Sequence, residues 1–191
     1  MTATASYELM KKVCLLGDPG VGKTSLIRRF VTDNFDDHYI STIGAKITKK
    51  TIPIEIPARQ LSVALILMIW DLAGQKEYMA FHEMHMKGME GVLAVADLTR
   101  RNASDSLKGA LAMADRMGVD VPMVFMLNKA DLAEPSDEEL KDIRKLAAQE
   151  SIPVLATSAK TGLNVEQAFC RLGSEMVESW ALRKFGPLPD L

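Results

Sequence analysis

The 191-residue chain has little of what marks secreted, membrane-spanning or nucleic-acid-binding proteins. Its only two cysteines, Cys14 and Cys170, sit in apolar surroundings, which predicts free thiols in a reducing cytosol. The longest nearly apolar run, 63–70, is far shorter than the roughly 20 residues of a membrane-spanning helix. The formal net charge of −2 gives no basis for nucleic-acid binding. Residues 1–6 lack the positively charged and apolar regions of a signal peptide, so we expect a cytoplasmic protein.

The bulk composition is that of an ordinary globular protein. Hydrophobic residues make up 48% of the chain and charged residues 25%, and we see no internal repeat or low-complexity tract. This length is typical of one domain, so we expect a single domain over residues 1–191.

The segment Gly17–Thr24 has the pattern G-x-x-x-x-G-K-T, which is typical of a loop that cradles phosphates. A strand-like run precedes it and a helix-like run follows, as the motif requires. The glycines let backbone N–H groups converge, Lys23 can reach the outer phosphates, and the Thr24 hydroxyl is placed to hold Mg²⁺. A chance match in a glycine-bearing turn is the alternative, expected in about one chain in a hundred. The predicted nucleotide contacts here are Gly20, Val21, Gly22, Lys23, Thr24 and Ser25.

Strand-like and helix-like runs alternate along the chain. Apolar runs predict strands at 11–16, 61–70, 92–96, 121–127 and 154–156, and helices over 23–31, 104–117, 136–150 and 165–183. Residues 45–72 are typical of a hairpin with its turn at 57–60, whose first arm, with Lys49, Lys50 and two prolines, should be a sheet edge. The pattern predicts an α/β, doubly wound, six-stranded, mostly parallel sheet with one antiparallel edge strand and about five helices.

The motif Asp71-x-x-Gly74-Gln75 follows the second hairpin arm. Ligands of doubly wound sheets bind at the carboxyl ends of the strands, where Asp71 could hold Mg²⁺. The Gly74 N–H could meet a third phosphate, and Gln75 could orient an attacking water. Asp71 could instead be a capping carboxylate and Gln75 a solvated loop residue.

Two further motifs, 128–131 and 157–160, follow the last two predicted strands. The Asp131 carboxylate could accept hydrogen bonds from guanine N1–H and its amine, which adenine does not offer. Asn128 belongs to the same motif, and the stem of Lys129 could cover one face of the base. Backbone N–H groups of Ser158, Ala159 and Lys160 could approach the base carbonyl.

The polar stretch 32–44 is long for a connection, as functional or mobile loops often are. Within it, the Thr42 hydroxyl could complete the Mg²⁺ shell and its amide could bond the third phosphate. Loss of those bonds after hydrolysis would release the loop. Phe35 could cover an edge of the base, or it could simply pack in the core.

Taken in order, these motifs resemble those of small GTPases of the Ras superfamily, closest to the Rab and Rho branches. The matching pieces span nearly the whole chain: 17–25, 41–44, 70–75, 91–97, 128–131 and 157–160. The resemblance implies a P-loop NTPase fold, Mg²⁺-GTP binding and slow hydrolysis to GDP. It also implies two switch segments, around 33–44 and 72–89, read by effectors, exchange factors and GTPase-activating proteins.

Three features depart from the family pattern. Pro19 stands where Ras has glycine, and it brings a rigid ring without an N–H close to the third phosphate. The stretch 42–71 is long, so we expect a hairpin extended at its tip. The last residues, 186–191, contain no cysteine for a prenyl anchor. Either the chain is truncated, or the protein is a soluble relative of prokaryotic or archaeal type that meets membranes only through partners.

Catalysis is assigned to Lys23, Gln75 and Thr42, and no arginine stands where it would reach the third phosphate. Arg28 and Arg29 are expected at the surface or the rim of the core. We therefore expect slow hydrolysis that a partner accelerates. Two rival functions remain: a guanine-nucleotide-binding scaffold with little or no hydrolysis, and an ATP-using P-loop enzyme, which Asp131 disfavours.

The segment 76–89 holds four methionines: Met79, Met84, Met86 and Met89. They could form an adaptable partner surface, or they could pack against the sheet. His82 and His85 lie in the same segment, and without a third ligand nearby they are better explained as ordinary side chains than as a metal site.

Overall fold

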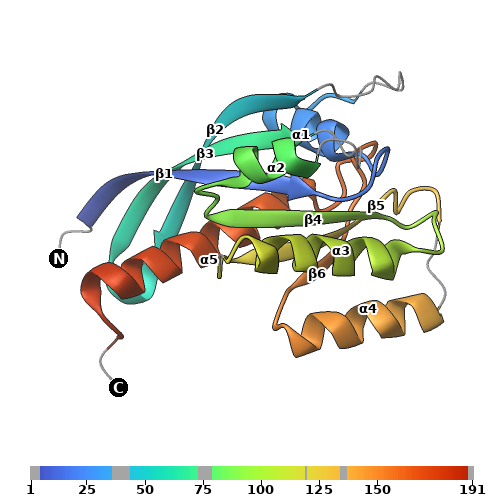
Figure 1. The fold of residues 1–191 in the computed structure, drawn as a ribbon. Coiled ribbons are helices and arrows are strands. Elements are labelled where there is room, and N and C mark those ends of the chain that lie inside the picture. The colour runs from blue at the N-terminus through green and yellow to red at the C-terminus, as the bar shows by residue number, and fades with distance from the viewer. Residues whose placement is uncertain (1–4, 36–43, 73–78, 119, 134–136, 189–191) are drawn as a thin grey trace.

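Six strands form one sheet in the order β2-β3-β1-β4-β5-β6 (Figure 1). The computed structural model describes residues 5–35, 44–72, 79–118, 120–133 and 137–188. β2 runs antiparallel to β3, and all other neighbouring strands are parallel, which confirms the predicted sheet. The strands are β1 (Ala5–Leu16), β2 (Ala45–Ile56), β3 (Leu61–Leu72), β4 (Gly91–Asp97), β5 (Met123–Asn128) and β6 (Val154–Ala156).

Five α-helices cover the two faces of this sheet, as predicted. They are α1 (Lys23–Thr32), α2 (Met79–Met86), α3 (Ala103–Arg116), α4 (Asp137–Gln149) and α5 (Val165–Phe185). Buried side chains of α1 and α5 share one core with the sheet, where Phe30 stacks on Phe169 at 3.9 Å between ring centroids. Side chains of α2, α3 and α4 share a second core on the opposite face. Figure 1 shows the long α5 crossing the sheet on the face opposite α3.

The hairpin of β2 and β3 lies at one edge of the sheet. Its strands pair in continuous register from Ala45 opposite Leu72 to Ile56 opposite Leu61. A short 3₁₀ turn, Pro57–Arg59, joins them. β2 is the edge strand and β3 lies between β2 and β1, as predicted. Pro53 and the lysines of β2 fit an edge, because charge and a missing N–H donor oppose pairing with another chain.

β1 is longer than the sequence pattern indicated. The expected strand covered only 11–16, whereas β1 begins at Ala5 and pairs with β3 from Ala5 opposite Leu61 onward. Its outer half alternates polar and apolar residues, because only one side is covered there. On the covered side, Tyr7 meets Trp180 of α5 edge-on, with ring centroids 5.2 Å apart. The other expected elements differ from the observed bounds by two residues or fewer.

The methionines of the segment after β3 divide between core and surface. Met86 and Met89 are buried in the core beneath α2 and α3, whereas Met84 is 57% exposed. Packing against the sheet therefore explains two of them and leaves Met84 at the surface. The side chain of Met79 lies outside the described part. Both cysteines are free, and burial raises the pKa of the Cys14 thiol to about 12.

Candidate functional site

Four of the sequence motifs meet at one edge of the sheet. The phosphate loop follows β1, Asp71 lies near the end of β3, Asn128 ends β5, and Thr157 follows β6. Because these strands are parallel, their carboxyl ends share one edge of the sheet. The topology therefore brings together residues that are up to 140 positions apart in the chain.

The loop between β1 and α1 depends on glycine at two tight positions. Gly17 has φ +146°, and a Cβ there would stand 2.1 Å from the Val95 carbonyl oxygen. Gly22 has φ +103°, and a Cβ there would stand 2.3 Å from Asn128 Nδ2. Neither position accepts a larger residue without displacing its neighbour. Pro19, in the same loop, is exposed.

Lys23 begins α1 and folds back over the loop. Its ammonium is 2.7 Å from the Gly17 carbonyl and 3.0 Å from that of Asp18. Burial lowers the pKa of Lys23 to about 8, while the nearby carboxylates of Asp71 and Asp18 oppose the shift. Gly22, which precedes the helix, supplies no capping side chain. The N–H groups of the first helical turn therefore face the loop together with the Lys23 cation.

Thr24 and Asp71 place two oxygen atoms side by side next to the phosphate loop. The Thr24 hydroxyl donates to Asp71 Oδ2 at 2.5 Å, and Asp71 is 2% exposed. Hydroxyl and carboxylate oxygens are the hard ligands that Mg²⁺ prefers. Among the side chains that the structure describes, no group of three or more His, Cys, Asp or Glu residues lies together in a metal-binding arrangement. Protein sites for Mg²⁺ commonly supply one or two oxygen ligands and leave the others to phosphate and water.

Asn128 joins three loops of the site. Its Nδ2 donates to the Val21 carbonyl at 2.8 Å, and its Oδ1 accepts from the Ala159 N–H at 3.2 Å. The residue is 1% exposed, so both ends of its amide are satisfied within the protein. The phosphate loop, the 128–131 motif and the 157–160 motif are thereby held at one relative position.

Asp131 lies beside the 157–160 loop, at the surface. The Ser158 hydroxyl donates to Asp131 Oδ1 at 2.6 Å, and Ser158 Oγ in turn accepts from the Thr161 N–H at 3.0 Å. Ser158 is fully buried, whereas Asp131 remains exposed. The pair orients the carboxylate while leaving it accessible to a ligand. Lys160, the last residue of the motif, is exposed.

Asp97, at the end of β4, is a site residue that motif analysis missed. Its Oδ2 is 2.6 Å from Lys129 Nζ and 3.3 Å from Arg100 Nε. Burial works to raise the pKa of Asp97, but hydrogen bonds from Lys129 and Thr99 outweigh it and hold the pKa below its ordinary value. Lys129 itself has φ +66°, so the ion pair fixes a side chain on a constrained backbone. The sequence does place the Asp97 carboxylate at a strand end, and Lys129 directly follows the neighbouring strand β5. That placement could have indicated the ion pair.

Arg29, which was expected at the surface or the rim of the core, also forms hydrogen bonds with the 157–160 loop. Its guanidinium donates to the Ala159 and Lys160 carbonyls, the former at 2.8 Å from Nε. Its Nη1 donates to the Asp33 carbonyl and carboxylate, each at 3.2 Å. No sequence motif indicates the bond to Ala159, because that residue lies 130 positions further along the chain.

Several predicted residues carry less structural information. Thr42, Gly74 and Gln75 lie outside the described residues. Phe35 is partly buried and packs against the core under α1 and α5. Gly20 has φ +76° and Ser25 is partly buried in the first turn of α1. The positions of these residues do not test the predicted nucleotide contacts.

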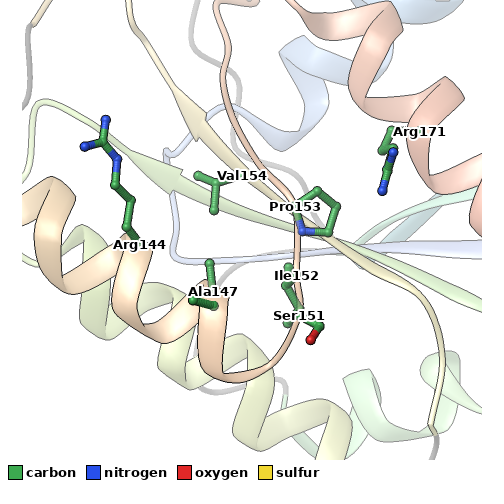
Figure 2. A pocket seen from close by; sticks show the side chains of 8 residues that line it. Arg144, Ala147, Ser151, Ile152, Pro153, Val154 and Arg171 are labelled. Atoms are coloured by element: carbon green, nitrogen blue, oxygen red, sulfur yellow. The ribbon is translucent and has the colours of Figure 1, made fainter.

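A cavity of about 400 Å³ lies away from this edge, among α4, the residues before β6, and α5. Figure 2 shows Arg144 and Arg171 on either side of it, with Ile152 and Pro153 between them. It lies at the amino end of β6, whereas the motif residues lie at the carboxyl ends of the strands. None of the predicted site residues lines it.

Within the described residues, no helix is long and apolar enough to cross a membrane.

The fold and the gathered motifs define a P-loop nucleotide-binding protein of the doubly wound α/β class. Comparison with known protein families identifies it more specifically, because the sequence model of the Ras family matches residues 12–178. The chain is 34% identical over 176 residues to Ras-related protein Rab-1C of Dictyostelium discoideum, covering 91% of this chain and 84% of that protein. It is 34% identical over 173 residues to GTP-binding protein ypt1 of Schizosaccharomyces pombe, covering 90% and 82%.

The same similarity extends to an animal protein. The chain is 35% identical over 159 residues to human Ras-related protein Rab-31, covering 83% of this chain and 78% of that protein. The chain therefore belongs to the Ras family of small GTPases. It is a GTP-binding switch protein with GTP hydrolase activity.

Proposed function

We propose that this protein is a Mg²⁺-dependent GTPase switch whose pocket reads guanine at one end and the phosphates at the other. The observation that carries the proposal is the double contact of Asn128 with Val21 and Ala159. It ties the loop for phosphates to the loop for the base, so that one nucleotide can span both. Partner proteins would read the segments around 33–44 and 72–89.

At the phosphate end, Lys23 and the N–H groups of the loop supply positive charge. The ammonium now rests on two backbone carbonyls, which a phosphate oxygen would replace with a charge-assisted bond. Thr24 and Asp71 would hold Mg²⁺, which supplies charge neutralisation between the outer phosphates when bound. The fit is supported by the adjacent hard oxygens of this pair.

At the base end, Asp131 provides the selective contact. Its carboxylate accepts from Ser158 and stays exposed, so it is oriented for the N1–H and amine of guanine. Adenine offers this carboxylate no such pair of N–H donors, so an adenine nucleotide would bind without that contact. Lys129, held by Asp97, would lay its stem against the base. These contacts favour a guanine nucleotide over the ATP-using alternative.

For hydrolysis, phosphoryl transfer relies on positioning and charge more than on covalent chemistry. Gln75 and the backbone of Thr42 would place the attacking water, and Thr42 would also complete the Mg²⁺ shell. Among the described residues, Arg29 is engaged with the 157–160 loop and Arg100 with Asp97. We therefore propose that turnover is slow alone and is accelerated by a partner protein.

The test identifies the nucleotide released on denaturing the purified protein and then measures single-turnover phosphate release. Guanine nucleotide together with a rate that falls at least tenfold in Gln75→Leu supports the switch. Guanine nucleotide with no turnover in either protein supports the scaffold alternative instead. Adenine nucleotide, or unaided turnover of several per second, contradicts the proposal.

A further inference from the structure

The guanidinium of Arg29 makes its main contacts with two consecutive carbonyls of one distant loop. The Nε–Nη2 edge donates to the Ala159 and Lys160 carbonyls, and the Nη1 edge donates to Asp33. The planar fork of arginine suits such paired acceptors, which a lysine cannot match. Only 18% of the side chain is exposed, so these bonds replace most of the water around the charge.

The residue Ala159 is consequently held from both sides by side chains of other elements. Asn128 Oδ1 of β5 accepts from its N–H at 3.2 Å, and Arg29 Nε of α1 donates to its carbonyl at 2.8 Å. Because a peptide unit is planar and trans, holding the Ala159 carbonyl also fixes the direction of the following Lys160 N–H, opposite to Arg29. Loop backbone that is clamped in this way loses little further freedom when a ligand binds.

The ion pair with Asp33 adds little to this arrangement. The Asp33 carboxylate is 93% exposed, and an ion pair with such an exposed partner contributes little to stability. The bonds to the Ala159 and Lys160 carbonyls therefore account for most of what Arg29 does. They join α1, which begins at the phosphate-binding Lys23, to the loop at the base end.

We propose that Arg29 is a positioning residue that sets how long a guanine nucleotide stays bound. It acts by holding the Ala159–Lys160 backbone against the carbonyl of the base, and this rests on the proposed function of that loop. Without the clamp, the Lys160 N–H would move away from the base carbonyl, so the nucleotide would leave faster. Recognition of the guanine N1–H and amine by Asp131 is left in place.

The experiment measures dissociation rates in Mg²⁺ for Arg29→Gln, Arg29→Lys and a matched control, Arg171→Gln. Arg171 lies on α5, is 58% exposed and pairs with Glu175 of the same helix. Arg171→Gln therefore removes the same charge as Arg29→Gln at a position outside the site. For GDP we expect at least a tenfold faster release from Arg29→Gln, a smaller increase from Arg29→Lys, and no change from Arg171→Gln.

Base analogues separate positioning from general destabilisation. Inosine diphosphate keeps the base carbonyl, so the Arg29→Gln effect should persist at least tenfold. The diphosphate of 2-aminopurine riboside lacks that carbonyl, so the effect should fall below about twofold. An equal acceleration for all three nucleotides would show a merely structural role, and no acceleration for GDP would overturn the proposal outright. If the unaltered protein binds ADP as well as GDP, the proposed function itself fails instead.

Discussion

Asn128 Nδ2 lies 2.8 Å from the Val21 carbonyl oxygen and so joins the end of β5 to the phosphate loop. The two residues are 107 positions apart in the chain, and Asn128 is almost completely buried. This bond directly connects the phosphate loop with the 128–131 motif. Its removal should therefore affect the binding of both parts of a nucleotide.

Asn128→Ala tests that connection. The change leaves the Val21 carbonyl and the Ala159 N–H without their partner, at a cost of about 1–3 kcal/mol for each buried group. We expect a lower free energy of unfolding in urea and a loss of GDP affinity of at least tenfold. A variant with unchanged stability and unchanged GDP affinity would contradict the role assigned to this residue.

Gly22→Ala tests the close approach of the loop to Asn128. A Cβ at this position would stand 2.3 Å from Asn128 Nδ2, on a backbone with φ +103°. The amide must move away, so GDP binding measured by calorimetry should weaken at least tenfold. Gly118→Ala is the matched control, because Gly118 has φ +62° and nothing within 4 Å of the added Cβ. It should lose about 1 kcal/mol of stability and keep its GDP affinity.

Asp97→Asn tests the ion pair that holds Lys129. The folded protein holds the pKa of Asp97 below its ordinary value, so this carboxylate contributes stability above about pH 4. That contribution is lost as the pH falls through the folded pKa, because the folded state then takes up the proton. We expect Asp97→Asn to be less stable by about 2 kcal/mol at pH 7 and to lose less stability on acidification.

The measurement for that pair is the free energy of unfolding at pH 7 and pH 3 for both proteins. Asp105→Asn is the control, since Asp105 pairs with Lys108 on the surface of α3 with 76% of its side chain exposed. Its stability should change by less than about 0.5 kcal/mol at either pH. Parallel pH curves for Asp97→Asn and the unaltered protein would refute the ion pair's contribution.

Much of the fold and site could be predicted because it depends on local patterns. Pro53 and the lysines of β2 mark an edge strand by their chemistry alone. The motifs fall at strand ends that the alternation of elements brings together. Ala5–Met10 was missed because a strand covered on one side has no continuous apolar run. It is stabilised by pairing with β3 and by Trp180, both distant in sequence.

Arg29 and Asp97 were missed for a related reason. Which of two consecutive arginines faces the 157–160 loop depends on how α1 is rotated against a segment 130 residues further on. The contact of Asp97 with Lys129 can be predicted only when the strand order is known. β4 and β5 pair so that Asp97 lies opposite Asn128, which precedes Lys129. Long-range packing, which no single motif encodes, decides both contacts.

The proposed pocket binds the guanine base and the phosphates of one nucleotide together. Its most direct test is competition of GDP and ADP for the purified protein against a fluorescent GDP derivative, in the presence of Mg²⁺. We expect ADP to compete more weakly by roughly a thousandfold or more, because adenine offers the Asp131 carboxylate no pair of N–H donors. Competition by ADP within tenfold of GDP would contradict it.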